Sequence, residues 1–444
     1  MNKAEREELA LRALGHSSAD QTEILVSAAD NALTRFARGI SNQNVASRDH
    51  AISVRAIVDG RTGVAATNRL DEPSLDAVVQ RAIDIASFVP PDPMQPKLPS
   101  GDGIVNVPAN AYFPHTASAS PQMRATAAGG MLTEAERLKF WCSGYVSTSS
   151  NGITIANSSG ALASFDATDS AANVKVTAPD STGYAEHYSR NFGAIDGVAI
   201  GARAVEKAQR SASPRNVDPG DWTVILEPAA FGELLAYVAS HFSAQSYADG
   251  SSFFSGKLGE RYFGESLTIT DDFSHHLAPG MPFDYEAQPK QRVTLVDSGV
   301  IRNIVTDSYY AHKLSVENTG HALPAPNAWG PQPLNIVVAS GTSSTEELIA
   351  ETTRGLLVTR FWYIRTVDQK RAIVTGMTRD GTFLIEGGKI LGGIRNMRFN
   401  QSIVEALAKA TFANKPQRTG GYSYSLVVPA AKIEGFRFTS GTEF

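Results

Sequence analysis

The sequence has 444 residues with 45 acidic and 40 basic side chains, so its formal net charge of −5 is small for its length. Its 42% of hydrophobic and 19% of charged residues can build buried cores, in about two to four domains, which excludes global disorder. No dense basic run occurs and Cys142 is the only cysteine. The composition therefore argues against nucleic-acid binding, intrachain disulfides and multi-cysteine metal sites.

The first 20 residues predict a short amphipathic helix, because charged side chains there alternate with Leu and Ala. They lack the apolar run and the small-residue cleavage site of a secretion signal. Nowhere do about 18 apolar residues follow one another, which is the length that a membrane-spanning helix needs. We therefore expect a soluble, cytoplasmic protein that makes no membrane contact.

The N-terminal unit is predicted to be a small antiparallel sheet covered by a helix. Apolar and polar side chains alternate through residues 23–68, with a turn at Asp59-Gly60. Residues 74–88 then place their apolar side chains on one face of a helix. The prolines of residues 89–103 exclude a helix or a central strand, so this stretch is expected to be a linker.

The central segment gives weaker signals. A helix is expected over residues 121–140, short strands rich in Ser, Thr and Asn over residues 143–176, and a second helix over residues 195–211. The turn-forming residues 214–221 mark a second boundary. No solenoid-type repeat of fixed period is found.

The C-terminal half is predicted to be dominated by strands. The predicted fold class is α+β, with an N-terminal antiparallel sheet and covering helix followed by a large β-rich C-terminal domain. The expected domains are 1–95, 96–217 and 218–444. In the last of these we expect a strand at 223–228, a helix at 229–244, strands at 266–270, 291–297, 301–308, 334–339 and 356–364, and hairpins at Asp380-Gly381 and Gly387-Gly388.

Several catalytic motifs are absent from the sequence. The glycines of residues 387–393 lack the Ser or Thr after lysine that a phosphate-binding loop requires, so Lys389 is expected to be a hairpin residue. No G-x-S-x-G element of a hydrolase nucleophile occurs. A zinc peptidase needs two histidines with a glutamate beside the first, and no His-Glu pair is present.

Two groups of titratable residues allow more than one interpretation. His275 and His276 are adjacent and would point to opposite faces of an extended strand, so a surface loop without metal is the preferred interpretation. Asp284 and Glu286 lie two residues apart, which on a strand puts both carboxylates on one face. That geometry suits a cation or an arginine partner, and a solvated face without function is the alternative.

Blocks of sequence at both ends of the chain resemble one family. The N-terminal blocks are L-T-R-F-A-x-x-I-x-N-Q-N in residues 33–44 and S-V-R-A-I-V-D-G-R-x-G-V-A in residues 53–65. The C-terminal blocks include F-D-Y-E in residues 283–286 and N-T-G-H-A in residues 318–322. In content and order these blocks are similar to the TldD/PmbA family.

The resemblance implies that this chain is of the TldE/PmbA type. In that family, TldD-type chains hold zinc on an H-E-x-x-x-H helix, and TldE/PmbA-type chains are their partners. Here Ala236 and Tyr237 occupy the positions of the first histidine and the glutamate, and only His241 matches. One imidazole does not supply the three protein ligands of a catalytic zinc. We therefore expect no catalytic residue, metal or other cofactor in this chain, and zinc in a TldD-like partner.

The resemblance favours a non-catalytic subunit of a heteromeric zinc metallopeptidase that trims flexible peptides in proteolysis and peptide maturation. Its partner is expected to be a TldD-like sister chain in a heterodimer, with a homodimer when the chain is alone and no nucleic acid. The alternatives are an autonomous hydrolase that uses Asp284, Glu286 and His321, or a peptide-binding scaffold without catalysis. The residues expected to line a chamber or to contact a subunit are Glu233, Tyr237, His241, Asp284, Glu286, Thr319, Gly320 and His321.

Overall fold

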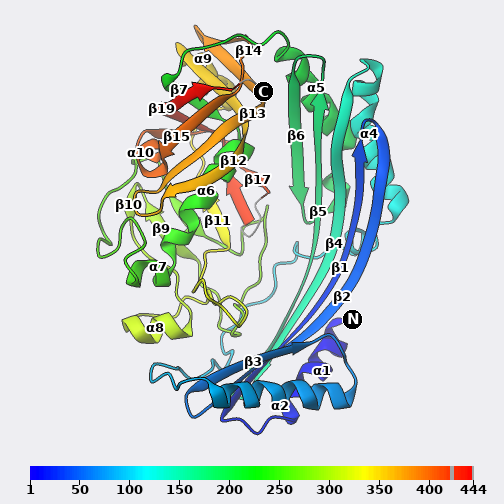
Figure 1. Cartoon of the computed structure of the whole chain (residues 1–444), viewed down its shortest axis with the longest axis vertical. Coiled ribbons are helices and arrows are strands. Elements are labelled where there is room, and N and C mark those ends of the chain that lie inside the picture. Colours follow the sequence, from blue (N-terminus) through cyan, green and yellow to red (C-terminus); the bar gives the residue numbers. More distant parts are fainter. Residues whose placement is uncertain (421–424, 443–444) are drawn as a thin grey trace.

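The computed structural model describes residues 1–420 and 425–442 of the chain. A long sheet runs along one side of the molecule, and the strands and short helices of the C-terminal half form a more compact body on the other side (Figure 1). Helices α1 (Lys3–Gly15) and α2 (Glu72–Phe88) lie at one end of the long sheet. This combination of helices with antiparallel and mixed sheets confirms the predicted α+β class.

The long sheet has six antiparallel strands in the order β3-β2-β1-β4-β5-β6. The first three confirm the sheet expected over residues 23–68. The prediction of short strands over residues 143–176 is wrong, because β4 has 17 residues and continues the same sheet by pairing with β1. The sheet thus joins residues on both sides of position 95, while the domain boundaries themselves stay a prediction. The strands are β1 (Gln21–Ala37), β2 (Ile40–Val58), β3 (Arg61–Thr67), β4 (Trp141–Asn157), β5 (Leu162–Thr177) and β6 (Thr182–Ser189).

Helices pack against this sheet and begin at side-chain caps. Asp71, Ser120 and Asp196 each accept a hydrogen bond from a backbone N–H in the first turn of a helix. The apolar faces of these helices are buried against the sheet in two clusters. The helices expected in this half are confirmed, and α3 is an additional single turn. Beside α1 and α2 they are α3 (Pro114–Ala117), α4 (Pro121–Arg137) and α5 (Gly197–Arg210).

The long sheet repeats itself after 120 residues. The β1–β2 register recurs between β4 and β5 with every residue number raised by 120, over residues 21–35 of β1. The pair Ala56↔Gly63 between β2 and β3 likewise recurs as Val176↔Gly183 between β5 and β6. Each half consists of a helix, three strands and a helix, and the halves meet where β1 pairs antiparallel with β4. This is a twofold duplication of one unit.

The C-terminal half contains two mixed sheets around one core. Their orders are β10-β9-β8-β11-β18-β17 and β12-β7-β19-β15-β13-β14, with β16 pairing with β19. Leu234 and Leu235 of helix α6 pack into the core that both sheets share, which confirms the β-rich C-terminal region. The strands are β7 (Gly220–Leu226), β8 (Ile269–Asp271), β9 (Val293–Asp297), β10 (Val300–Ile301), β11 (Asn335–Val338), β12 (Arg354–Asp368), β13 (Ile373–Glu386), β14 (Lys389–Gly393), β15 (Met397–Ser402), β16 (Ala410–Phe412), β17 (Gln417–Thr419), β18 (Ser425–Val428) and β19 (Ala431–Gly441). The helices are α6 (Pro228–Ala239), α7 (Ala244–Ala248), α8 (Ser308–Leu314), α9 (Thr345–Ala350) and α10 (Ile403–Leu407), with a 3-10 turn at Ser240–Phe242. Another 3-10 turn, at Phe192–Ala194, precedes α5 in the long-sheet half.

Two local predictions in this half are wrong. The strand expected over residues 301–308 is short, because Asp307 accepts the backbone N–H of Tyr310 at 2.8 Å and starts helix α8. The hairpin expected at Asp380-Gly381 is a bulge inside β13, whereas the one at Gly387-Gly388 joins β13 to β14. An Asp-Gly pair supplies positive φ angles, and a bulge uses these as readily as a turn does.

The proline-rich stretch of residues 89–103 forms no helix or strand, as predicted, but it is held against the sheet. The Leu98 N–H donates to the Gln21 side chain at 2.8 Å, and Asn157 donates to the Pro99 carbonyl at 2.8 Å. Leu98 itself is buried. Separately, no helix within the described ranges is both long and apolar enough to cross a membrane.

Candidate functional site

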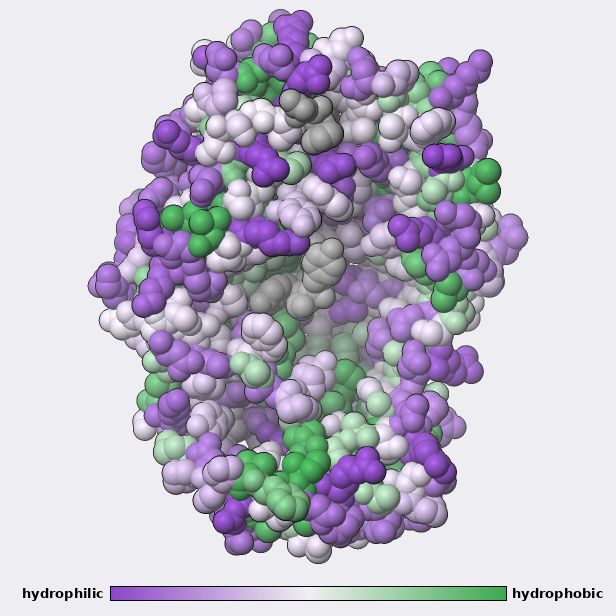
Figure 2. Space-filling view, in the orientation of Figure 1, coloured by the Kyte–Doolittle hydropathy of each residue, from purple (hydrophilic) through white to green (hydrophobic). Residues whose placement is uncertain are grey.

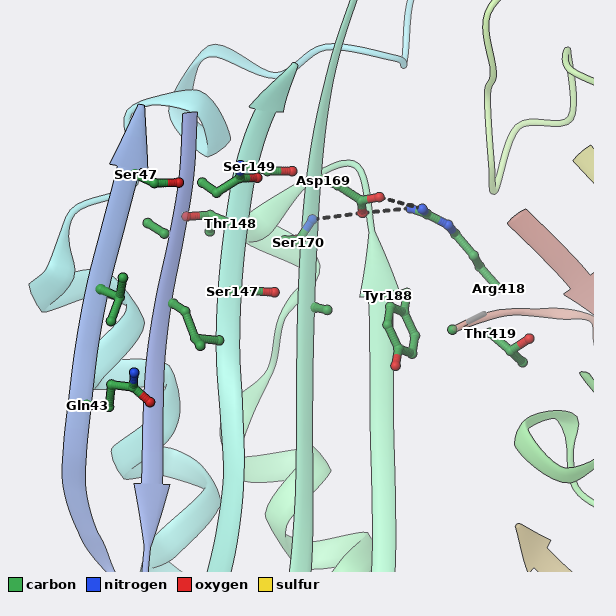
Figure 3. Close-up of a pocket in the computed structure, with 16 residues that line it drawn as sticks. Gln43, Ser47, Ser147, Thr148, Ser149, Asp169, Ser170, Tyr188, Arg418 and Thr419 are labelled. Atoms are coloured by element: carbon green, nitrogen blue, oxygen red, sulfur yellow. Dashed lines mark hydrogen bonds and ion pairs between the residues drawn. The ribbon is translucent and has the colours of Figure 1, made fainter. Parts of the chain in front are cut away.

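A cleft lies between the long sheet and strand β17. Its narrower part is a cavity of about 440 Å³ whose floor is the sheet face formed by β1, β2, β4, β5 and β6. Figure 3 shows Asp169 and Tyr188 on the sheet opposite Arg418 and Thr419 of β17. The face drawn in Figure 2 is hollowed near its centre, between largely hydrophilic flanks.

The floor of the cleft combines small and polar side chains with the apolar Leu33 and Val45. Strand pairing places Ser47, Asn31, Ser149 and Asp169 in one row across four strands. Short side chains leave the sheet face open, and their hydroxyl and amide groups can bond the backbone of an extended chain. The floor is therefore suited to a flat, extended polypeptide.

A bidentate ion pair links the two walls of the narrower part of the cleft. Both terminal nitrogens of Arg418 contact the Asp169 carboxylate, at 2.9 and 2.6 Å. Arg190 approaches the same carboxylate at 3.5 Å. Because Asp169 belongs to β5 and Arg418 to β17, this bidentate pair fixes the long sheet against the C-terminal body.

The wider part of the cleft, about 820 Å³, has a wall of titratable side chains. The Tyr184 hydroxyl donates to Glu186 at 2.6 Å, and both residues line the cavity from β6. Burial raises the pKa of Glu186, and it also raises that of Tyr184. The Arg360 guanidinium stacks 4.1 Å from the Tyr184 ring centre and pairs with the buried Asp380 at 2.7 Å.

Glu233, a predicted site residue, lies behind this wall on helix α6. Its carboxylate accepts the Phe361 N–H at 2.8 Å. Burial raises the pKa of Glu233 to about 8, because its effect is larger than the lowering of that pKa by the nearby Arg360 guanidinium. A carboxyl group with this pKa carries a proton through much of the neutral range, so it acts as a hydrogen-bonding group rather than as a fixed charge.

Tyr237 and His241 make structural contacts at the other predicted helix positions. The Tyr237 hydroxyl donates to the Ile364 carbonyl at 2.6 Å. His241 is buried, its Nδ1 accepts the Phe253 N–H at 3.4 Å, and its Nε2 lies 3.4 Å from the amide nitrogen of Gln369. Burial lowers the pKa of His241 to about 4, so the ring is neutral at physiological pH.

These contacts do not fit a zinc site on α6. Ala236 offers no ligand atom, the Tyr237 oxygen is committed to a backbone carbonyl, and both ring nitrogens of His241 have protein neighbours. Across residues 1–420 and 425–442, no three His, Cys, Asp or Glu side chains gather as a metal-binding group.

Asp284 and Glu286 lie in a buried turn, so their expected placement on a strand and the solvated alternative are both wrong. Both oxygens of Asp284 are occupied by backbone N–H groups, including that of Ala322 at 2.8 Å. Glu286 does have the expected arginine partner, since Arg55 contacts it at 2.9 Å and contacts Glu23 at 2.7 Å. Burial raises the pKa of Glu23 to about 7 and that of Asp284 to about 8.

Thr319, Gly320 and His321 belong to the same buried region, because Ala322 follows His321 and bonds Asp284. His321 Nδ1 lies 3.0 Å from the Thr319 hydroxyl, and its Nε2 lies 3.2 Å from Asp271. Gly320 has a φ of 73°, and a side chain there would meet the Pro289 carbonyl. The structure thus brings the predicted loop residues together, and a chamber or subunit role for them stays a prediction.

The remaining histidine pair lies in a turn. His275 and His276 lie in a loop near the surface, which confirms the preferred placement, and their ring centres are stacked 4.6 Å apart. Opposite faces require extended backbone, and the backbone turns here.

Sequence reasoning missed the residues of the cleft itself. Tyr184, Glu186 and Tyr188 alternate along β6, so a period of two in polar side chains could have indicated a shared face. Asp169 and Arg418 are 249 positions apart, and no local pattern connects them.

Comparisons with known proteins place these features in context. Residues 219–440 match the profile of the PmbA/TldA metallopeptidase C-terminal domain, and residues 22–86 match PmbA/TldA metallopeptidase domain 1. The chain is 25% identical to metalloprotease PmbA of Escherichia coli over 356 residues, covering 77% of this chain and 76% of that protein. It is 27% identical to a metalloprotease TldD homolog of Haemophilus influenzae over 221 residues, which are 49% of this chain and 45% of that one.

The fold is also similar to a solved structure. The crystal structure of TldE from Thermococcus kodakarensis superimposes with a TM-score of 0.89 at 20% identity, covering 98% of this chain and 99% of that one. At this identity the likeness concerns the fold alone. It extends over the long sheet, including the central segment that neither family profile matches.

Proposed function

The chain belongs to the PmbA/TldD metallopeptidase family, and we propose that it is a non-catalytic, TldE-like subunit in it. In this proposal it completes a chamber around the zinc site of a TldD-like sister chain, in a cytoplasmic heterodimer. The complex trims flexible peptides in proteolysis and peptide maturation. Alone, the chain forms a homodimer and cleaves nothing.

The observation that carries the proposal is the state of helix α6. At the family's metal-motif positions this chain has Ala236 and Tyr237, and the Tyr237 hydroxyl bonds the Ile364 carbonyl at 2.6 Å. His241, the one matching position, is buried among protein neighbours. A helix that packs in this way supports the scaffold and leaves the metal chemistry to the partner.

The cleft supports a peptide as the shared substrate. Its sheet floor presents polar side chains together with Leu33 and Val45, which suits an extended chain with both kinds of side chain. Enclosure by a second subunit would hold such a peptide beside the partner's metal and restrict its motion.

The autonomous-hydrolase alternative has less support. It requires Asp284, Glu286 and His321 to face a substrate, and all three are buried and held by neighbouring groups. The scaffold without catalysis differs from our proposal only in lacking the zinc-bearing partner.

The test is reconstitution with a TldD-like sister chain. We expect the two chains to co-purify, and we expect an unstructured peptide to be cleaved much faster by the pair than by either chain. A chelator should abolish this activity. Chelator-insensitive hydrolysis by this chain alone would contradict the proposal, and so would unchanged activity of a sister chain when this chain is added.

A further inference from the structure

A strained bulge in β12 displays two aromatic side chains. Tyr363 has a φ of 59°, a left-handed conformation that bulky residues rarely adopt. The pairing with β13 shifts here, because Trp362 faces Met377 whereas Arg365 faces Thr375. Tyr363 is 64% exposed and Trp362 is 43% exposed. Strain of this kind persists where the surroundings enforce it, and it is concentrated at functional sites.

Helix α6 holds the bulge on both sides. Glu233 accepts the N–H of the buried Phe361, and Tyr237 donates to the carbonyl of the buried Ile364. Neither contact involves the exposed rings of the bulge. Helix α6 therefore fixes the backbone of the bulge through its two flanking residues.

Arginines stack on both exposed rings. The Arg365 guanidinium lies 4.3 Å from the Tyr363 ring centre, and that of Arg379 lies 5.2 Å from the Trp362 ring centre. No carboxylate in the described part of the chain forms an ion pair with Arg365 or Arg379. Arg365 Nη1 also donates to the Ile364 carbonyl at 2.7 Å, so stacking and this hydrogen bond together hold its guanidinium. The Nε and Nη2 side of the same group can still bind a carboxylate in a bidentate manner, and so can the stacked guanidinium of Arg379.

The aromatic-arginine patch, formed by Trp362, Tyr363, Arg365 and Arg379, adjoins the cleft. Arg360 connects the two, since it stacks 5.2 Å from the Trp362 ring centre and 4.1 Å from that of Tyr184. Tyr184 lines the wider part of the cleft. An extended chain that leaves the cleft past β6 would thus cross the patch.

We propose that the aromatic-arginine patch binds acidic side chains of the peptide that occupies the cleft, so that the chain selects peptides with carboxylates. This inference rests on the proposed function, because it identifies the class of that substrate. Trp, Tyr and Arg are the residues that dominate binding hot spots. Charge-assisted bidentate contacts from two immobilised arginines would distinguish Glu from its isosteric amide Gln.

Fluorescence anisotropy tests this proposal with the full chain and two labelled unstructured peptides, one of Glu, Gly and Ser and one with every Glu replaced by Gln. We expect the Glu peptide to bind at least about tenfold more tightly. The variant R365Q/R379Q should remove the difference, whereas Arg137→Gln, on a distant helix, should preserve it. Equal affinities for the two peptides, or no binding of the Glu peptide, would overturn the proposal.

Tyr363→Gly separates binding from folding. Glycine tolerates the left-handed backbone, so the melting temperature should not fall, while affinity for the Glu peptide should decrease. Unchanged affinity in this variant, or tighter binding of a single-stranded oligonucleotide than of the Glu peptide, would contradict the assignment. If the sister chain is stimulated toward the Gln peptide but no preference for Glu is seen, the inference fails while the proposed function stands. If the chains do not assemble but the preference for the Glu peptide is seen, the proposed function fails while the acidic selectivity of the patch stands.

Discussion

Tyr237 shows how one side chain determines the role of a helix position. A glutamate there, with a histidine at position 236, would provide two of the family's motif residues beside His241. The Tyr237 hydroxyl instead donates a hydrogen bond to the Ile364 carbonyl, which fixes α6 against β12. The same position thus serves the packing of two elements, and its oxygen is committed to a backbone carbonyl.

The zinc content of the purified chain tests whether positions 236 and 237 can take part in a metal site. The purified chain should hold no stoichiometric zinc, and A236H/Y237E should bind zinc only weakly, because a third family-type ligand is not apparent in the sequence. The double variant should also lose roughly 1–3 kcal/mol of stability, since its carboxylate would face the Ile364 carbonyl. Elemental analysis and thermal unfolding measure both, with Ala236→His as the control. About one tightly held zinc in the unmodified chain would refute the prediction.

Glu23 gives a pH-dependent prediction. Burial raises its pKa to about 7 from an ordinary 4.5, so the folded protein binds more protons than the unfolded protein between these values. The free energy of unfolding should therefore fall as the pH rises through this window. Glu23→Gln should remove up to roughly 3 kcal/mol of that fall. Chemical denaturation at about pH 5 and about pH 8 measures it. The exposed Glu8→Gln should leave the pH dependence unchanged, and an unchanged dependence in Glu23→Gln would refute the prediction.

At the scale of elements, the duplicated unit explains why glycine recurs at one strand position. A Cβ atom on Gly63 would lie 2.0 Å from the Ala82 carbonyl of α2, and one on Gly183 would lie 2.0 Å from the Ala204 carbonyl of α5. In both halves the backbone of the third strand therefore lies in direct contact with the backbone of the helix that covers it. The repeat preserves a packing requirement, although most side chains of the two halves differ.

Substitution of these glycines tests the helix contact. Gly183→Ala should destabilise the chain by about 2–3 kcal/mol, because helix α5 must move away from β6. Gly63→Ala should have a similar cost at α2. Gly441→Ala, on β19 with no atom within 4 Å of the added Cβ, is the matched control in a strand and should be nearly neutral. Equal unfolding free energies for all three variants would show that the helices are not so closely packed.

At the scale of the whole molecule, the width of the cleft depends on the contact between two bodies. The Asp169–Arg418 pair crosses it with two hydrogen bonds, and Arg418 is largely buried. Lys207–Glu227 and Lys175–Asp380 also join the long sheet and its helices to the C-terminal body, and Asp169–Arg418 is the bidentate pair among the three.

Arg418→Gln tests this connection. We expect a loss of roughly 1–2 kcal/mol of stability and faster amide hydrogen exchange in β6 and β17. Arg437→Gln breaks an exposed ion pair with Asp221. This control should change neither the stability nor the amide hydrogen exchange of β6 and β17. Unchanged exchange in β6 would mean that other contacts keep the walls together.

Prediction from the sequence succeeded for the elements whose side chains follow a local period. Residues 74–88 form α2, and the alternation in residues 23–68 became three strands. It failed where a local signal has two outcomes, as at Asp380-Gly381, which forms a bulge instead of a turn. It also failed for residues 143–176, because Ser, Thr and Asn occur in loops as well as on the open face of a sheet.

Local sequence specifies the long helices, the alternation in the N-terminal strands and the blocks shared with the family, because each depends on neighbouring residues or on ordered blocks. Tertiary structure alone decided that Glu286 meets Arg55, 231 positions away, and that Asp169 meets Arg418, 249 positions away. It also decided that Glu233 and Tyr237 support a strained aromatic bulge. Such pairs depend on how sheets and helices stack, and stacking follows from the burial of whole apolar faces. No short stretch of sequence specifies which distant polar groups that burial brings together.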